Sequence, residues 1–129
     1  MDTVTPQIVL ASCSPRRKML LKQLGIKFDV ISSDIHENIE HSLLPEQFAE
    51  TLALRKAQAV AASLSESSES IVIGADTIVV DSVGILGKPK DEVDAYRMLA
   101  RLSGQVHRVI TGLALISTQS SSKTLVRHE

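Results

Sequence analysis

The sequence is poor in aromatic residues, in cysteine and in net charge, and each shortage excludes a class of protein. Aromatic side chains make up 2% of the 129 residues, too few for a platform that stacks the bases of single-stranded nucleic acid. The single cysteine, Cys13, excludes an internal disulfide framework and a multi-cysteine zinc site. Lys and Arg number 14 against 15 Asp and Glu, so no overall field attracts a nucleic-acid polymer or an anionic membrane.

Long hydrophobic runs are also missing. The longest uncharged apolar run, Val109 to Ile116, is far shorter than the roughly 20 residues that cross a bilayer. The basic cluster Arg16 to Lys18 follows the first apolar run, which is the reverse of the order in a signal peptide. These absences predict a cytoplasmic protein without a membrane partner.

What the chain does contain is typical of a globular domain. Hydrophobic residues make up 43% and charged residues 22% of the sequence, which excludes collagen-like, coiled-coil and disordered classes. A chain of 129 residues suits one domain and can bury roughly two-thirds of its unfolded surface. We therefore expect residues 1–129 to form a single domain.

Hydrophobic periodicity predicts alternating strands and helices. A helix is expected from Pro15, with Ser14 as its cap and Gly25 as its stop, because glycine enters the left-handed cap conformation cheaply. Two apolar segments, 71–73 and 78–80, predict either one long strand or two interrupted ones. The other expected elements are strands at 8–12, 28–31 and 106–116, a helix from Pro45, a turn at 81–84 and a helix over 91–102.

This order of elements predicts the fold class. Strands that alternate with helices favour an α/β architecture, here a mixed, partly parallel sheet with flanking helices. Residues 117–129 lose the hydrophobic pattern, and an irregular tail is expected there.

The first candidate site is the turn from Ser12 to Arg17. A helix N-terminus presents unpaired N–H groups and a positive partial charge, so it can bind phosphate, and Arg16 and Arg17 would add forked donors. The competing interpretation is a capped surface helix with two solvated arginines, which spacing alone favours. Cys13 could be a nucleophile of lowered pKa, but without a partner residue a small buried filler is favoured.

The second candidate is Asp76, which lies between two apolar strand segments. A carboxylate there is costly unless it is paired, hydrogen-bonded or bound to a metal. A metal-binding or water-activating aspartate would explain this position, and so would an aspartate that starts a turn.

Three further charged residues have weaker signals. Lys88 follows a strand, Lys56 lies on the second helix and Glu37 lies in the connection before it; a solvated lysine or an ordinary loop acid is the default for each. Taken with the arginines and Asp76, they form the set expected for a reaction at a phosphate chain that uses Mg²⁺ or Mn²⁺.

Ordered blocks of sequence resemble the Maf family of nucleoside triphosphate pyrophosphatases. The blocks are Leu10-Ala11-Ser12-Cys13-Ser14-Pro15-Arg16-Arg17, Lys56-Ala57, Ile73-Gly74-Ala75-Asp76-Thr77-Ile78-Val79, Gly87-Lys88-Pro89 and Leu102-Ser103-Gly104 through Thr111-Gly112. The resemblance implies a fold similar to that of inosine triphosphatase and hydrolysis of a nucleoside triphosphate to the monophosphate and pyrophosphate with a divalent cation. It leaves a homodimer open.

The same resemblance implies roles for individual residues. Asp76 would accept the proton of the attacking water, and Glu37 with Asp76 would lie near the metal. The phosphates would be held by Ser12, Arg16, Arg17, Lys56 and Lys88. Arg16 and Thr77 match the variant that resembles enzymes for dTTP and UTP.

The resemblance stops before the end of the family's pattern. Family members continue through a K-A-G-x-Y-x-I-Q-G-like segment, whose glutamine takes part in substrate choice, and residues 117–129 do not match it. The chain is therefore expected to be an incomplete domain. One alternative is a catalytically silent fragment that binds a nucleotide or a partner, and another is a phosphate-binding regulatory module that uses only the Ser12 to Arg17 turn.

Overall fold

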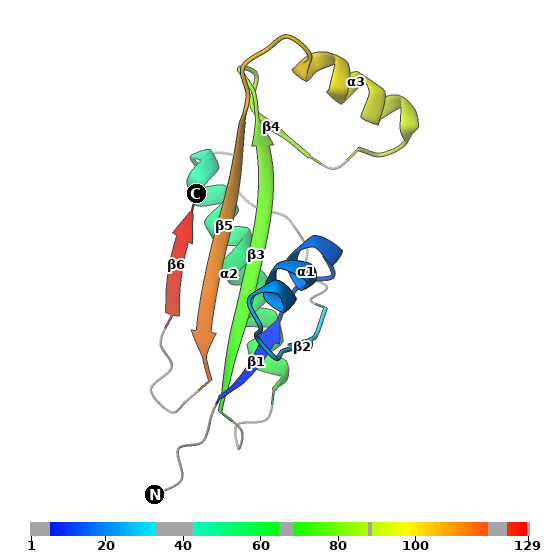
Figure 1. Cartoon of the computed structure of the whole chain (residues 1–129). Helices are drawn as coiled ribbons and strands as arrows, with labels where there is room; N and C mark the ends of the chain where they lie inside the picture. The colour runs from blue at the N-terminus through cyan, green and yellow to red at the C-terminus, as the bar shows by residue number, and fades with distance from the viewer. Residues whose placement is uncertain (1–5, 33–42, 65–68, 88, 119–123, 129) are drawn as a thin grey trace, which may run out of the picture.

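The computed structural model describes residues 6–32, 43–64, 69–87, 89–118 and 124–128. These residues form one mixed sheet with helices on both of its faces (Figure 1). In chain order the elements are β1 Gln7–Leu10, α1 Pro15–Gln23, β2 Asp29–Val30, α2 Pro45–Ser63, β3 Ser70–Val80, β4 Ile85–Leu86, α3 Glu92–Leu102, β5 Arg108–Ser117 and β6 Thr124–His128.

The sheet confirms the predicted fold class. Its strands follow the order β2-β1-β3-β5-β6, with β1 parallel to both β2 and β3 and with β5 antiparallel to both β3 and β6. The apolar segments around Asp76 belong to one uninterrupted strand, β3, which pairs with β5 from Ile71 to Val80.

Two expectations at the ends of strands are settled by pairing. The turn at 81–84 forms a hairpin, because β4 pairs antiparallel with the end of β3. The irregular tail predicted for 117–129 is wrong over Thr124–His128, which forms β6 and pairs with β5 from Gly112 to Ile116. Strand pairing uses backbone N–H and C=O groups, so β6 pairs with β5 although its sequence lacks a hydrophobic pattern.

The core lies between α2 and the sheet. Ala49, Ala53 and Ala57 on α2 have no exposed surface, and β3 and β5 turn glycines toward them. A Cβ atom on Gly74 would lie 2.2 Å from the Ala53 carbonyl oxygen, and one on Gly112 would lie 2.2 Å from that of Ala49. Small residues on both sides therefore let the helix backbone approach the sheet closely.

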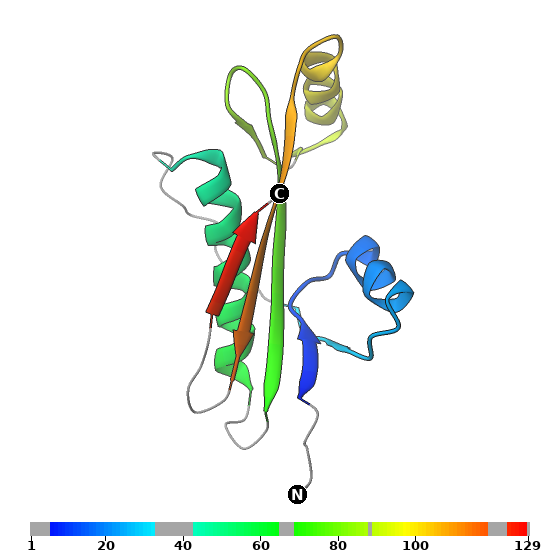
Figure 2. The same cartoon turned by 60° about the vertical axis from the view of Figure 1, so that its left-hand side comes forward.

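Helix α1 covers the opposite face of the sheet (Figure 2). Its start follows the prediction, with Ser14 as the N-cap and Pro15 in the first turn, and Gly25 follows its end with a φ of +74°. No residue of α1 is buried, so this face is covered more loosely than the α2 face. No helix among the residues described above has the length and apolar character of a membrane span.

An ion pair holds α3 at the far end of β3, and it predicts a dependence of stability on acid pH. Asp81 accepts hydrogen bonds from Arg101 Nη2 at 2.6 Å and from the backbone N–H groups of Val83 and Gly84. Its side chain is 4% exposed. Hydrogen bonding by Arg101 holds the pKa of Asp81 well below its usual range.

A carboxyl with a lowered folded-state pKa stabilises the fold above its unfolded pKa. Below about pH 4 the Asp81 carboxyl binds a proton in the unfolded chain but not in the folded chain. Its contribution to the free energy of unfolding is therefore lost as the pH falls. We expect urea midpoints measured between pH 3 and 7 to fall less steeply on the acid side for Asp81→Asn than for the unaltered chain. Equal acid slopes would contradict this assignment.

Candidate functional site

The candidate site lies where β1 ends and β3 continues. Pairing of β1 with β3 stops at Leu10 and Ile73, and β4 joins the same edge of β3 only at Val79. Between these pairings no described strand lies against that edge, and the chain leaves β1 there to enter α1. In open α/β sheets, ligands bind in crevices outside the carboxyl ends of strands.

The turn that leads into α1 is held by side-chain hydroxyls. Ser12 is 8% exposed, and its Oγ accepts a hydrogen bond from the Ser14 N–H at 3.2 Å. Ser14 Oγ in turn accepts one from the Arg17 N–H at 3.5 Å, as an N-cap residue does. These local hydrogen bonds therefore fix the first turn of α1 and the position from which the Arg17 side chain extends.

Arg17 reaches from α1 to the middle of β3. Its Nη2 donates to Thr77 Oγ1 at 2.8 Å and its Nη1 donates to Ser12 Oγ at 3.3 Å. Burial lowers the pKa of the Arg17 guanidinium; the negative charge of Asp76 opposes this shift, and the positive charge of Arg16 adds to it. Arginine nevertheless stays protonated, so Arg17 presents a partly desolvated positive charge that a bound anion would stabilise.

Asp76 pairs with Lys56 on the α2 side of the sheet. Lys56 Nζ lies 2.8 Å from Asp76 Oδ1, and the two side chains are 16% and 12% exposed. Asp76 therefore does not start a turn, because it lies inside the continuous strand β3 opposite Gly112. Lys56 is likewise no solvated lysine. The ion pair explains how an acid is tolerated between apolar strand segments.

These contacts place two pairs of residues on opposite faces of β3. Successive residues of a strand point to opposite faces, so Asp76 meets Lys56 on the α2 face while Thr77 meets Arg17 on the α1 face. The two groups are adjacent along β3, at the edge that no described strand covers. The site thus combines two cations, one carboxylate and several hydroxyls at an open strand edge.

The structure brings together five of the residues proposed from the sequence: Ser12, Arg17, Lys56, Asp76 and Thr77. Arg16 is exposed on the first turn of α1. Glu37 and Lys88 lie outside the described residues, so their predicted roles remain predictions.

Two residues differ from the sequence interpretation. Cys13 is exposed rather than a buried filler, because it leaves the sheet with the turn that follows β1. The sequence assigns Thr111 no role, yet its Oγ1 lies 2.9 Å from Thr77 Oγ1. Thr111 lies at the end of one of the sequence blocks, but that block does not indicate that Thr77 is its partner.

The described residues of the candidate site offer one carboxylate, Asp76, to a metal ion. The described part of the chain holds no group of three or more His, Cys, Asp or Glu side chains placed to bind one ion. Mg²⁺ is often bound by one or two carboxylates together with the phosphates of a substrate. Asp76 is the carboxylate that the described contacts place in the site, so it fits this mode of binding.

Comparison with known proteins extends these observations. A family model described as "Maf-like protein" matches residues 7–129. A protein named dTTP/UTP pyrophosphatase from Ruminiclostridium cellulolyticum is 50% identical over 123 residues, which cover 95% of this chain and 62% of that protein. A protein of the same name from Clostridioides difficile is 48% identical over 118 residues, covering 92% of this chain and 59% of that protein.

The chain spans about three-fifths of the length of these curated relatives. Among solved structures it is similar to the Staphylococcus aureus Ham1 protein, with a TM-score of 0.57 and 20% identity, covering 95% of this chain and 68% of that one. It is also similar to a nucleoside-triphosphatase, a dITP/XTP pyrophosphatase, from Mycobacterium abscessus, with a TM-score of 0.52 and 15% identity, covering 95% and 70%. These likenesses concern the fold alone, and they agree with the fold class predicted from the sequence.

Proposed function

The chain belongs to the Maf family, and from that membership and the site we propose that it hydrolyses dTTP or UTP to the nucleoside monophosphate and pyrophosphate. The relatives that are about half identical to it carry the name dTTP/UTP pyrophosphatase. One observation carries the proposal. The Lys56–Asp76 ion pair and the hydrogen bond from Arg17 to Thr77 lie next to each other along β3, at one open strand edge. A phosphate chain needs cations along it and one base at the reacting phosphorus.

The reaction can be assigned to atoms. A water oxygen forms a bond to the α-phosphorus, the bond from that phosphorus to the oxygen that bridges to the β-phosphorus breaks, and pyrophosphate leaves with the electron pair. Asp76 accepts the proton that the water loses. Lys56 Nζ lies 2.8 Å from the carboxylate, so the ammonium holds the Asp76 side chain in position for this step.

Arg17 is proposed to bind phosphate oxygens of the substrate. Its guanidinium is fixed by two hydroxyl acceptors, Ser12 Oγ and Thr77 Oγ1, which orient the group without neutralising its charge. Free donors of a planar guanidinium match phosphate oxygens. Arg16, exposed beside it, is proposed to add a second charge for the phosphates, and Lys88 a third.

A divalent cation, Mg²⁺ or Mn²⁺, is part of the proposal. Asp76 would hold it together with the phosphates, and Glu37 is the second carboxylate proposed from the sequence. When bound, such an ion neutralises charge on the phosphates and makes the α-phosphorus easier to attack. A nucleotide substrate also agrees with the cytoplasmic location that the sequence predicts.

The direct test incubates the purified 129-residue chain with dTTP, UTP, CTP or 7-methyl-GTP and measures pyrophosphate. We expect release from dTTP or UTP in the presence of Mg²⁺ or Mn²⁺, and loss of that release when EDTA removes the metal. The matched reaction without nucleotide corrects for contaminating pyrophosphate.

The same assay separates the alternatives. A folded chain, shown by circular dichroism, that releases pyrophosphate from none of the four nucleotides would contradict the proposed activity. Release that is equal for all four would contradict the preference for dTTP and UTP.

A further inference from the structure

We propose that Thr111 is a positioning residue that holds Thr77, and through it Arg17, in the orientation that receives the phosphates. The proposal rests on the function proposed above and adds a residue for which the sequence blocks implied no role. Its basis is a chain of hydrogen bonds that runs from Thr111 to Thr77, on to Arg17 and then to Ser12, with distances of 2.9, 2.8 and 3.3 Å.

Strand register places Thr111 where it can act. Thr111 on β5 is the direct cross-strand partner of Thr77 on β3, and such partners on one face have side chains close enough to interact. Thr77 is exposed and Thr111 is half-buried, so Thr111 is the better anchored of the two. The sheet therefore gives Thr77 a rigid neighbour on the side away from Arg17.

The chemistry of the hydroxyl groups explains why the contact matters. A threonine hydroxyl has one hydrogen to donate and two lone pairs to accept with. Thr77 Oγ1 accepts a hydrogen bond from Arg17 Nη2 with one lone pair. Its contact with Thr111 uses either its hydrogen or its second lone pair. In both cases the Thr77 side chain is held in one rotamer with an acceptor directed at the guanidinium.

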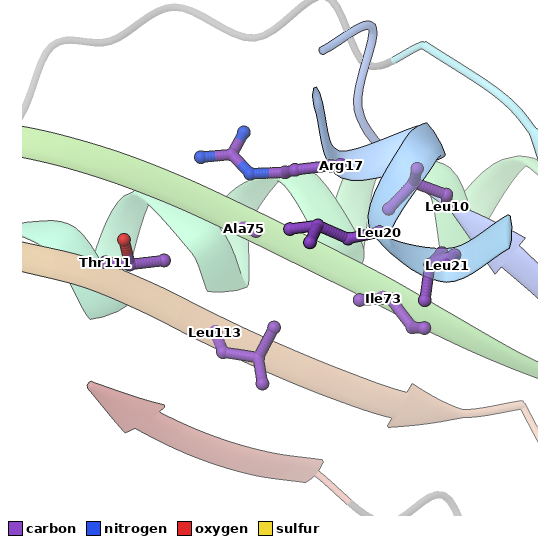
Figure 3. Close-up of a pocket in the computed structure, with 8 residues that line it drawn as sticks. All are labelled: Leu10, Arg17, Leu20, Leu21, Ile73, Ala75, Thr111 and Leu113. Carbon is purple, nitrogen blue, oxygen red and sulfur yellow. The ribbon is translucent and has the colours of Figure 1, made fainter. Parts of the chain in front are cut away.

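The surroundings of Arg17 make this polar anchor necessary. Arg17 and Thr111 line one cavity of about 200 Å³ whose other walls are apolar (Figure 3). Those walls are Leu10, Leu20, Leu21, Ile73, Ala75 and Leu113. Arg17 passes from α1 over β3, and the Thr111 hydroxyl lies on β5 on the same side of the sheet. The Arg17 guanidinium donates to the neutral hydroxyl groups of Ser12 and Thr77, so its charge stays available to an anion while its orientation is fixed.

The test compares Thr111→Val, which removes the hydroxyl and keeps the shape, with Thr111→Ser, which keeps the hydroxyl. Affinity for dTTP and for inorganic triphosphate is measured by calorimetry in EDTA, where dTTP is not hydrolysed. We expect Thr111→Val to weaken both affinities about two- to tenfold, the effect of one hydrogen bond, and Thr111→Ser to retain them. Thr77→Val combined with Thr111→Val should be no weaker than Thr77→Val alone, because the two hydroxyls act in series.

A second readout needs no ligand. The NMR signal of the Arg17 side-chain Nε–H, assigned by its loss in Arg17→Lys, should show a less ordered guanidinium in Thr111→Val and an unchanged one in Thr111→Ser. Thr51→Val, the same chemical change on α2, is the matched control and should leave affinity and signal unchanged.

The outcomes separate the two proposals. Unchanged affinity and an unchanged Arg17 signal in Thr111→Val would overturn the role of Thr111, and so would additive losses in the double variant. An unaltered chain that binds neither dTTP nor triphosphate would contradict the proposed function, while the Arg17 signal would still decide whether Thr111 orients that side chain.

Discussion

Replacing Asp76 with asparagine is expected to lower kcat for pyrophosphate release from dTTP by about 10²–10⁴-fold, the usual share of a general base. Asparagine keeps the shape of aspartate but cannot accept the proton of the attacking water. Asp76 lies inside a strand and 2.8 Å from Lys56 Nζ. A neighbouring group therefore cannot easily move into the place of its carboxylate. The measurement is the steady-state rate with the metal at saturation.

Loss of folding must be separated from loss of chemistry in this experiment. Asp76→Asn leaves the Lys56 ammonium without its counter-charge, and removing one partner of a mostly buried pair destabilises a fold. The double variant Lys56→Met and Asp76→Asn removes both charges, so it should recover stability in urea without recovering activity. Glu92→Gln, an exposed position on α3, is the control for an acid-to-amide change and should keep the full rate. Wild-type turnover in Asp76→Asn would show that another group is the base.

Replacing Gly74 with alanine is expected to destabilise the fold by about 1–3 kcal/mol or more, the range for overpacking of a core. The new Cβ would lie 2.2 Å from the Ala53 carbonyl oxygen and 2.9 Å from both Ala57 N and Cβ. These are mostly backbone atoms, so α2 as a whole must move away from β3. Since Lys56 directly precedes Ala57, this movement should also separate Lys56 from Asp76 and lower activity.

Gly87→Ala is the matched control for this prediction. A Cβ atom at Gly87 would meet no atom of the described residues within 4 Å, and the Gly87 backbone does not have a positive φ. We expect a lower urea midpoint for Gly74→Ala and an almost unchanged one for Gly87→Ala. Equal stability of the two variants would mean that α2 does not approach the sheet as closely as the structure has it.

The sequence by itself determined most of the secondary structure, because the signals are local. Ser14 and Pro15 start α1 as predicted, and Asp91 caps α3 by accepting a hydrogen bond from the Asp94 N–H at 2.7 Å. The resemblance to the Maf family also points to Ser12, Arg17, Lys56, Asp76 and Thr77. A cap or a helix face depends on residues three or four positions apart, and such spacings can be read along the chain.

Only the tertiary structure decided which of these residues meet. The partners in the Lys56–Asp76 pair are 20 positions apart and those in the Arg17–Thr77 contact are 60 apart, so no periodicity relates them. Thr111 meets Thr77 through the register of β5 against β3, and β6 takes its place through pairing with β5. Register and edge pairing are set by the packing of the whole sheet, and for that reason these contacts are not encoded in any short stretch of sequence.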